Sequence, residues 1–140
     1  MRLTLLIAAL NELDMSCCDI GNAYLNAVYR DKLWTVAGSE FGSEKRSVMI
    51  IARILYGLKS SGVAWRARLA KTMKTLRYTL TQANQDLWLK RGVKPNRQEY
   101  YYYMLVYVDD VLHVHHNPEI DMKLLSSFYR LKDGVGSPSR

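Results

Sequence analysis

One long apolar segment of the chain ends in two acids and continues into a second apolar run: Tyr100-Tyr-Tyr-Tyr-Met-Leu-Val-Tyr-Val-Asp-Asp-Val-Leu-His-Val114. Residues 100–108 are rich in aromatic and β-branched side chains and are long enough for a buried strand. The pattern predicts a hairpin with Asp109 and Asp110 at its tip. Tight hairpin turns need positive φ and prefer Asn-Gly or Asp-Gly. Because two adjacent carboxylates repel each other, a hard divalent cation is the first candidate to compensate them.

The composition is that of a folded protein of one domain. The chain has 140 residues, of which 49% are hydrophobic and 24% charged, which argues against global disorder. We expect one domain over residues 1–135 and a disordered tail over 136–140. The formal net charge of +7 favours, with modest weight, a polyanionic partner. Cys17 and Cys18 are adjacent, cannot build a disulfide framework, and indicate a reducing, intracellular compartment.

The N-terminal apolar segment is predicted to be a helix packed on the core. Its large apolar side chains fall on one helical face, and these are Leu3, Leu6, Ile7, Leu10 and Leu13. A secretory signal is less favoured because no small-residue cleavage site follows the segment. The segment is also too short to span a bilayer, so we expect no membrane partner.

The remaining elements follow from periodicity and turn residues. Residues 60–78 are predicted to form a helix whose core stripe is Trp65, Leu69, Met73, Leu76 and Leu80. The other expected elements are a buried strand at 15–20, a helical turn at 21–27, strands at 32–37 and 47–54 around a polar loop at 38–46, a weak strand at 86–91 and a helix at 118–131 capped by Asn117. The predicted class is α+β, a small antiparallel sheet with helices packed on one face.

Asp19 is the third candidate acid, because it also ends an apolar strand. If that strand pairs with the hairpin, the carboxylates of Asp19, Asp109 and Asp110 converge at one end of the sheet. Mg²⁺ prefers octahedral oxygen coordination by a few carboxylates and substrate phosphates. Two such ions, about 3.5–4 Å apart, can clamp the attacking and leaving oxygens of a phosphoryl transfer. The alternative is that all three are solvated turn residues.

Three blocks of the sequence resemble one known family, in that family's order. The first is Asp19-Ile-Gly-Asn-Ala-Tyr-Leu-Asn26, the second Leu55-Tyr-Gly-Leu-Lys-Ser-Ser-Gly-Val-Ala-Trp65, and the third Leu105-Val-Tyr-Val-Asp-Asp-Val-Leu112. Shorter similarities occur at 38–42, 84–86 and 128–134. The chain is similar over nearly its whole length to the reverse transcriptase domain of copia-type LTR retrotransposons.

The resemblance implies a polymerase palm and RNA-directed DNA polymerase chemistry, which is two-metal nucleotidyl transfer to the 3′-hydroxyl of a DNA primer. Asp19 and Asp109 would be the main ligands of two Mg²⁺ ions, with Mn²⁺ as a possible substitute, and Asp110 an accessory ligand. The implied partners are an RNA or DNA template with its primer and dNTPs. Other polyprotein parts, integrase and RNase H, are further possible partners. An active element would place the protein in a cytoplasmic particle or the nucleus.

Further roles follow from the same resemblance. The backbone of Ile20, Gly21 and Asn22 would face the triphosphate, and Tyr24 would exclude a 2′-hydroxyl or, alternatively, be a core aromatic. Gly57 would allow close approach to the nascent base pair. Lys59 and Arg66 would contact nucleic acid. For Arg66 the alternative is that it belongs to a solvated helix surface.

The chain also departs from the family pattern. We expect incomplete fingers and thumb, and therefore little or no polymerase activity of the isolated chain. Two alternatives stay open: an inactive relic, and a non-catalytic basic module that binds nucleic acid. His113, His115 and His116 alternate on a strand without a partner at ligand spacing, so a zinc site is disfavoured and their role is left open.

Overall fold

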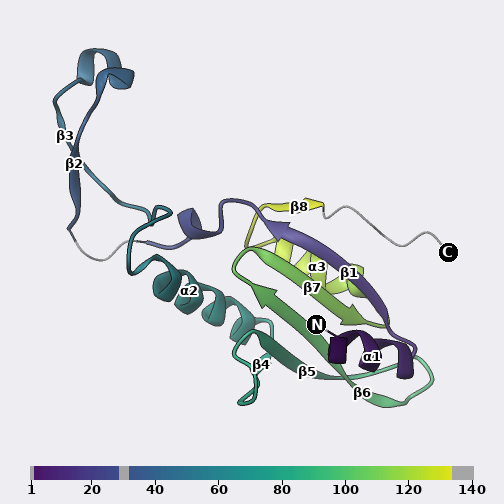
Figure 1. Ribbon diagram of the computed structural model, residues 1–140. Helices are drawn as coiled ribbons and strands as arrows, with labels where there is room; N and C mark the ends of the chain where they lie inside the picture. The colour runs from purple at the N-terminus through teal and green to yellow at the C-terminus, as the bar shows by residue number, and fades with distance from the viewer. Residues whose placement is uncertain (1, 29–31, 134–140) are drawn as a thin grey trace. The chain divides into compact units, whose positions relative to one another are not determined.

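The computed structural model of the chain describes residues 2–28 and 32–133 (Figure 1). The helices are α1 (Arg2–Leu10), α2 (Ser61–Thr75) and α3 (Pro118–Ser126), with 3-10 helices η1 (Ala23–Asn26) and η2 (Ser39–Glu44). The strands are β1 (Asp14–Ile20), β2 (Trp34–Val36), β3 (Val48–Ile50), β4 (Thr79–Leu80), β5 (Leu87–Val93), β6 (Glu99–Tyr107), β7 (Asp110–His115) and β8 (Leu131–Asp133). This mixture of helices and antiparallel strands confirms the predicted α+β class.

The chain divides into two compact units, each described by itself. Unit 1 comprises Met1–Gly21 and Leu69–Arg140, and unit 2 comprises Asn22–Arg68. Helix α2 begins in unit 2 and ends in unit 1. The expected tail at 136–140 lies outside the described residues, so the single-domain boundary remains a prediction.

Unit 1 is built on a six-stranded sheet of order β4-β5-β6-β7-β1-β8. Every neighbouring pair in this sheet is antiparallel. The longest pairing joins β5 to β6 over seven positions, from Leu87↔Leu105 to Val93↔Glu99. The weak strand predicted at 86–91 is therefore a full member of the sheet, because pairing with the aromatic strand β6 compensates for its polar composition.

The β6–β7 hairpin forms where the sequence predicts it, but its tip lies one residue earlier. Tyr107 pairs with Asp110, so Val108 and Asp109 make the turn and Asp110 already belongs to β7. The positive φ that a tight turn requires falls on Val108, at 55°. This is an unfavourable region for a β-branched residue, so the turn that carries Asp109 is strained.

Register separates the sheet into two faces, because residues directly opposite each other in antiparallel strands point to the same side. Trp88, Met104 and His113 occupy opposite positions on β5, β6 and β7 and are all buried, so we call their side the core face. Asp19 and Asp110 are opposite each other on β1 and β7, one position out of phase with that set. We call their side the acid face.

Helix α3 covers the core face, and it lies behind the sheet in Figure 1. The segment after it is joined to α2 by a hydrogen bond of 2.6 Å between the Tyr129 and Thr72 hydroxyls, both buried. The predicted stripe is confirmed within α2 for Trp65, Leu69 and Met73, which are buried. Leu76 is buried too, but it lies just beyond the end of the helix. Leu80 does not belong to it, because the helix ends at Thr75 and Leu80 lies exposed in β4.

The predicted apolar face of α1 is wrong. Leu6 and Leu10 are exposed by 54% and 74%, and Ile7 is half-buried. Leu13, just beyond the helix, is buried, and the side chain of Leu3 lies outside the described part of the chain. None of the helices in the described residues has the length and apolar character that crossing a bilayer requires.

Helix α1 packs on the sheet through small residues instead, on the side opposite to α3. Thr4 and Ala8 are buried, and Ala8 packs in one cluster with Leu13, Tyr100 and Val114. Val114 lies one position from the core-face residue His113, so this cluster reaches the acid face, and Figure 1 draws α1 in front of the sheet. The prediction that helices pack on a single face is therefore wrong for α1.

Three further details differ from the predictions. Cys18 is buried as expected, but Cys17 is exposed because alternation sends it to the acid face. Helix α3 ends at Ser126, and Leu131 begins β8, which pairs with β1. Asn117 occupies the N-cap position but makes no side-chain capping hydrogen bond.

Unit 2 contains the short hairpin β2–β3 and the helical turn η1. The predicted strands at 32–37 and 47–54 are confirmed as shorter ones, paired from Trp34↔Ile50 to Val36↔Val48. These four side chains are all exposed by more than half. The chain that follows β3 bridges back to Val28 through Arg53.

A buried polar network lies under the core face. Asp121 of α3 accepts a hydrogen bond from the Tyr78 hydroxyl. Its carboxylate oxygens lie 3.8 Å from His115 Nε2 and 3.9 Å from Lys90 Nζ. Burial, with Asp121 as the next cause, raises the pKa of Tyr78 above its usual range. The network ties α3 to β5, β7 and the segment after α2.

The burial of His113 predicts acid sensitivity. Burial lowers the pKa of His113 to about 4, whereas the unfolded chain takes up this proton near pH 6.5. Because the unfolded state binds more protons, we expect stability to fall as pH drops from about 6.5 to about 4, by on the order of 1–3 kcal/mol. Urea unfolding of the wild type and of His113→Leu measures this across the window. Equal pH slopes for the two proteins would contradict the assignment.

The strained turn predicts a stabilising substitution. Glycine adopts positive φ without the penalty of a β-branched side chain, so Val108→Gly is expected to raise the free energy of unfolding by about 0.5–1 kcal/mol. The matched control is Val93→Gly in β5, where Val93 is exposed and φ is negative; there the same change is expected to destabilise. Denaturant titration distinguishes the two. A loss of stability in Val108→Gly would show that the turn is unstrained.

Candidate metal centre

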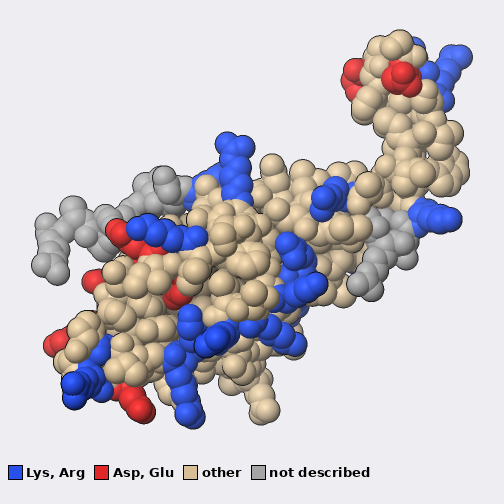
Figure 2. Space-filling view, turned by 180° about the vertical axis from the view of Figure 1, so that it is seen from behind, with Lys and Arg blue, Asp and Glu red and all other residues tan. Residues whose placement is uncertain are grey.

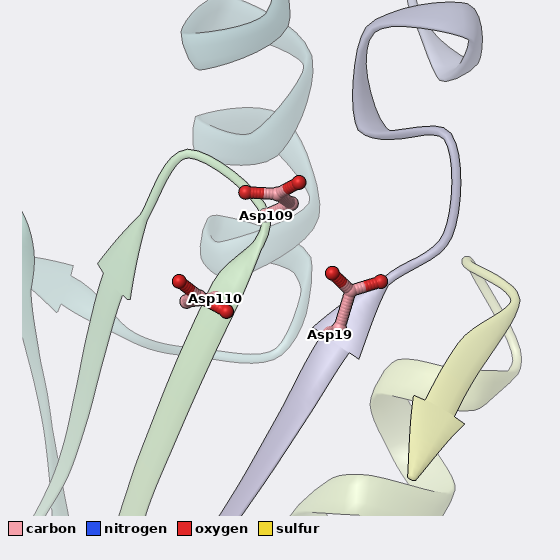
Figure 3. A group of neighbouring side chains, drawn as sticks. All are labelled: Asp19, Asp109 and Asp110. Carbon is pink, nitrogen blue, oxygen red and sulfur yellow. The ribbon is translucent and has the colours of Figure 1, made fainter. Parts of the chain in front are cut away.

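The pairing of β1 with β7 brings three carboxylates together, as the sequence predicts. Asp19 is directly opposite Asp110, and Asp109 precedes it in the hairpin turn. One carboxylate oxygen of each residue lies within 4.8 Å of the others. Figure 3 shows Asp109 on the turn, Asp110 at the start of β7 and Asp19 near the end of β1. Among the described residues, no other group of three or more His, Cys, Asp or Glu has this spacing.

Backbone hydrogen bonds fix the two segments that carry the acids. The Ile20 amide donates to the Asp109 carbonyl at 2.8 Å, which holds the turn against the end of β1. The Gly21 amide donates to the Arg130 carbonyl, also at 2.8 Å, and so anchors the segment that leads into β8. The Ile20 side chain is completely buried. The acids therefore stand on a rigid end of the sheet rather than on a free loop.

The site is electrostatically undercompensated. Asp19 and Asp109 are half-buried and Asp110 is exposed. Asp19 Oδ1 is buried and accepts no hydrogen bond within the described residues. Its charge partner is Lys132 Nζ, 3.3 Å away, from a side chain that is 63% exposed. In the described part of the chain, the three carboxylates thus have one ammonium group in ion-pair contact, and that contact is with Asp19.

The donor set fits a hard divalent cation. Three carboxylates supply oxygen ligands only, and an exposed side leaves room for water or phosphate oxygens. The buried Asp19 Oδ1, which no described donor satisfies, is a lone-pair site that a cation would fill. The three carboxylates are therefore a group that could hold a divalent metal ion.

The predicted triphosphate-facing segment has its amides partly engaged. The Ile20 and Gly21 amides donate to the carbonyls of Asp109 and Arg130, as described above. Asn22 is exposed and takes a left-handed conformation with φ of 52° at the start of η1. In this conformation the amides of Ile20 and Gly21 already donate hydrogen bonds within the protein. Contact of this segment with a nucleotide remains a prediction.

Tyr24 and Gly57 belong to unit 2, whereas the three acids belong to unit 1. Tyr24 is half-buried on η1, and its ring packs edge-on against Tyr56, with centroids 4.6 Å apart. Gly57 has φ of 89°, and a Cβ there would meet nothing within 4 Å. The glycine is therefore explained by its backbone conformation. Its predicted closeness to a base pair stays a prediction, as does the sugar-gating role of Tyr24.

The two predicted nucleic-acid contacts, Lys59 and Arg66, are both exposed. Lys59 precedes α2, and Arg66 lies on its second turn. Figure 2 shows that Lys and Arg side chains are spread over the face seen from behind and form no single uninterrupted patch. Exposure agrees with binding to phosphates but also with a solvated surface, so both roles remain predictions.

Sequence reasoning missed Lys132 as a member of this site. The residue lies in the 128–134 segment that resembles the family, but pattern alone does not reveal which residue a short edge strand places opposite Asp19. The histidines whose role the sequence does not predict are not part of this site. His113 and His115 lie on the core face, away from the acids.

Comparison with known proteins places the chain in a family. The family model described as reverse transcriptase (RNA-dependent DNA polymerase) matches residues 1–133. A relative is the retrovirus-related Pol polyprotein from transposon RE1 of Arabidopsis thaliana, 27% identical over 139 residues. The alignment covers 95% of this chain and 9% of that polyprotein, and no solved structure matches.

These comparisons confirm the resemblance that the three sequence blocks indicated. The matched region extends from α1 to β8 and so contains Asp19, Asp109 and Asp110. The chain belongs to the reverse transcriptase (RNA-dependent DNA polymerase) family.

Proposed function

We propose that this chain is the palm portion of an RNA-directed DNA polymerase of a copia-type retrotransposon. The observation that carries the proposal is the register that sets Asp19 opposite Asp110 beside the turn residue Asp109. Clusters of exposed acids are common without a bound ion. Membership of the reverse transcriptase family is therefore needed to support a metal-binding role for this cluster. The substrates are a template with a DNA primer, and dNTPs.

In this proposal Asp19 and Asp109 hold two Mg²⁺ ions, and Asp110 contributes as an accessory ligand. When bound, such ions activate the primer 3′-hydroxyl and neutralise the leaving pyrophosphate. The protein positions the carboxylates on a rigid sheet end and leaves the exposed side open to phosphate oxygens. No side-chain base is required for the hydroxyl proton.

The proposal also assigns roles in nucleotide and nucleic-acid binding to residues of unit 2. Tyr24 presents a ring that would clash with a ribose 2′-hydroxyl and so favours dNTPs over rNTPs. The edge-on packing against Tyr56 supports this role by restricting the ring. The turn at Gly57, with Lys59 and Arg66 beyond it, would contact the nascent pair and the nucleic-acid backbone.

The metal centre predicts a specific binding loss. Removing a ligand charge weakens coordination, so Asp19→Asn and Asp109→Asn are each expected to lower Mn²⁺ affinity on the order of tenfold or more. The matched control is Asp14→Asn, an exposed carboxylate at the other end of β1, which should bind as the wild type does. Titration with Mn²⁺ followed by electron paramagnetic resonance measures free ion.

Two results would contradict the proposal. One is equal Mn²⁺ affinity of the wild type, Asp109→Asn and Asp14→Asn. The other is nucleic-acid binding by a wild type that binds no divalent ion, which would favour the non-catalytic basic module.

Polymerase activity of the isolated chain is predicted to be weak. On the face that Figure 2 shows, Lys and Arg side chains are spread out and do not line one groove, and phosphate contacts supply most of the affinity for nucleic acid. Primer extension on poly(rA)/oligo(dT) with Mg²⁺ or Mn²⁺ should give little or no product, and any product should vanish in Asp109→Asn. Processive synthesis would contradict the expected weak binding of the primer–template by the isolated chain. Product that persists in Asp109→Asn would contradict the catalytic role assigned to Asp109.

A further inference from the structure

Lys132 is the one cation that the described residues place on a carboxylate of the metal centre. Its Nζ lies 3.3 Å from Asp19 Oδ1. Strand pairing sets Lys132 of β8 directly opposite Asp19 of β1. Residues opposite each other in an antiparallel pair share a face, so both side chains stand on the acid face. The contact is therefore a product of register rather than a chance meeting of two surface side chains.

Gly21, two residues after Asp19, lies beside the Lys132 side chain. A Cβ at Gly21 would stand 3.6 Å from Lys132 Cε and 3.1 Å from the Arg130 carbonyl oxygen. The 3.6 Å distance is ordinary van der Waals contact, so the aliphatic stem of Lys132 runs beside Gly21, and only the approach to the Arg130 carbonyl is tight. The hydrogen bond from the Gly21 amide to the Arg130 carbonyl fixes the approach of β8 at the same point.

Lys132 faces Asp19 Oδ1, a carboxylate oxygen that accepts no hydrogen bond from the described residues. Asp19 Oδ1 is buried, and no described group donates a hydrogen bond to it. At 3.3 Å the ammonium supplies charge without a well-aligned hydrogen bond. The pair is thus a weak, displaceable substitute for a metal ligand bond.

We propose that Lys132 is a built-in counter-ion that occupies the cation position at Asp19 in the metal-free protein and must leave it for a divalent ion to bind. This inference rests on the proposed metal centre. Lys132 and the metal ion compete for Asp19 Oδ1, so the lysine lowers metal affinity while relieving the repulsion among the three carboxylates. It is a positioning residue, not a catalytic one.

Removing the ammonium tests the competition. Lys132→Gln is expected to bind Mn²⁺ about three- to tenfold more tightly than the wild type at low salt, because a unit and a divalent charge repel across a few ångströms of water-accessible space. Lys132→Arg keeps the charge and should bind like the wild type. The matched control is Lys123→Gln, an exposed lysine on α3, which makes the same change in net charge away from the site.

Full-length variants are compared by Mn²⁺ titration with electron paramagnetic resonance detection, after circular dichroism has shown native folding. Lys132→Met serves as a second neutral variant. Tighter binding by both neutral variants, with Lys123→Gln unchanged, supports the inference. Equal or weaker binding by Lys132→Gln and Lys132→Met, while Asp109→Asn abolishes binding, overturns it and leaves the proposed function intact. Failure of the wild type and the neutral variants to bind Mn²⁺ overturns both.

Discussion

The antiparallel register between β1 and β7 is the constraint on which the rest of the account depends. It sets Asp19 opposite Asp110 and Cys18 opposite Val111. A slip of one residue would exchange the two faces, sending the Asp19 carboxylate into the core and the Cys18 thiol to the surface. The buried side chains of Cys18, Ile20 and Val111 make that slip costly, because they belong to the core face. Hydrophobic burial on one side of the sheet thereby positions charge on the other.

The two faces answer different physical demands. The core face pairs the buried Asp121 with the Tyr78 hydroxyl, although the buried His113 Nδ1 has no hydrogen-bond partner among the described residues. The acid face keeps three carboxylates close together with one ammonium nearby, which disfavours the metal-free state. The positive φ of Val108 adds strain in the turn that carries Asp109. Strain and like-charge repulsion at one place are typical of a site that is stabilised when its ligand binds.

The features that local pattern determines were predictable, and those set by pairing across the sheet were not. Alternation and aromatic content predict β6 and β7, and an apolar run ending in Asp19 predicts β1. The face of α1 was missed because Thr4 and Ala8, not the leucines, fit the space beside Val114. Lys132 was missed because the position of edge strand β8 depends on backbone contacts such as Gly21 with Arg130. The φ of Val108 was hidden because valine is among the residues least suited to it.

The central claim is that Asp19 and Asp109 bind divalent metal at the end of the sheet. The most direct measurement is an anomalous difference map from crystals of the protein soaked in Mn²⁺. The account predicts a peak in contact with carboxylate oxygens of both Asp19 and Asp109, with Lys132 Nζ withdrawn from Asp19 Oδ1. An ordered site without a peak at saturating Mn²⁺, with the Lys132–Asp19 contact intact, would contradict it.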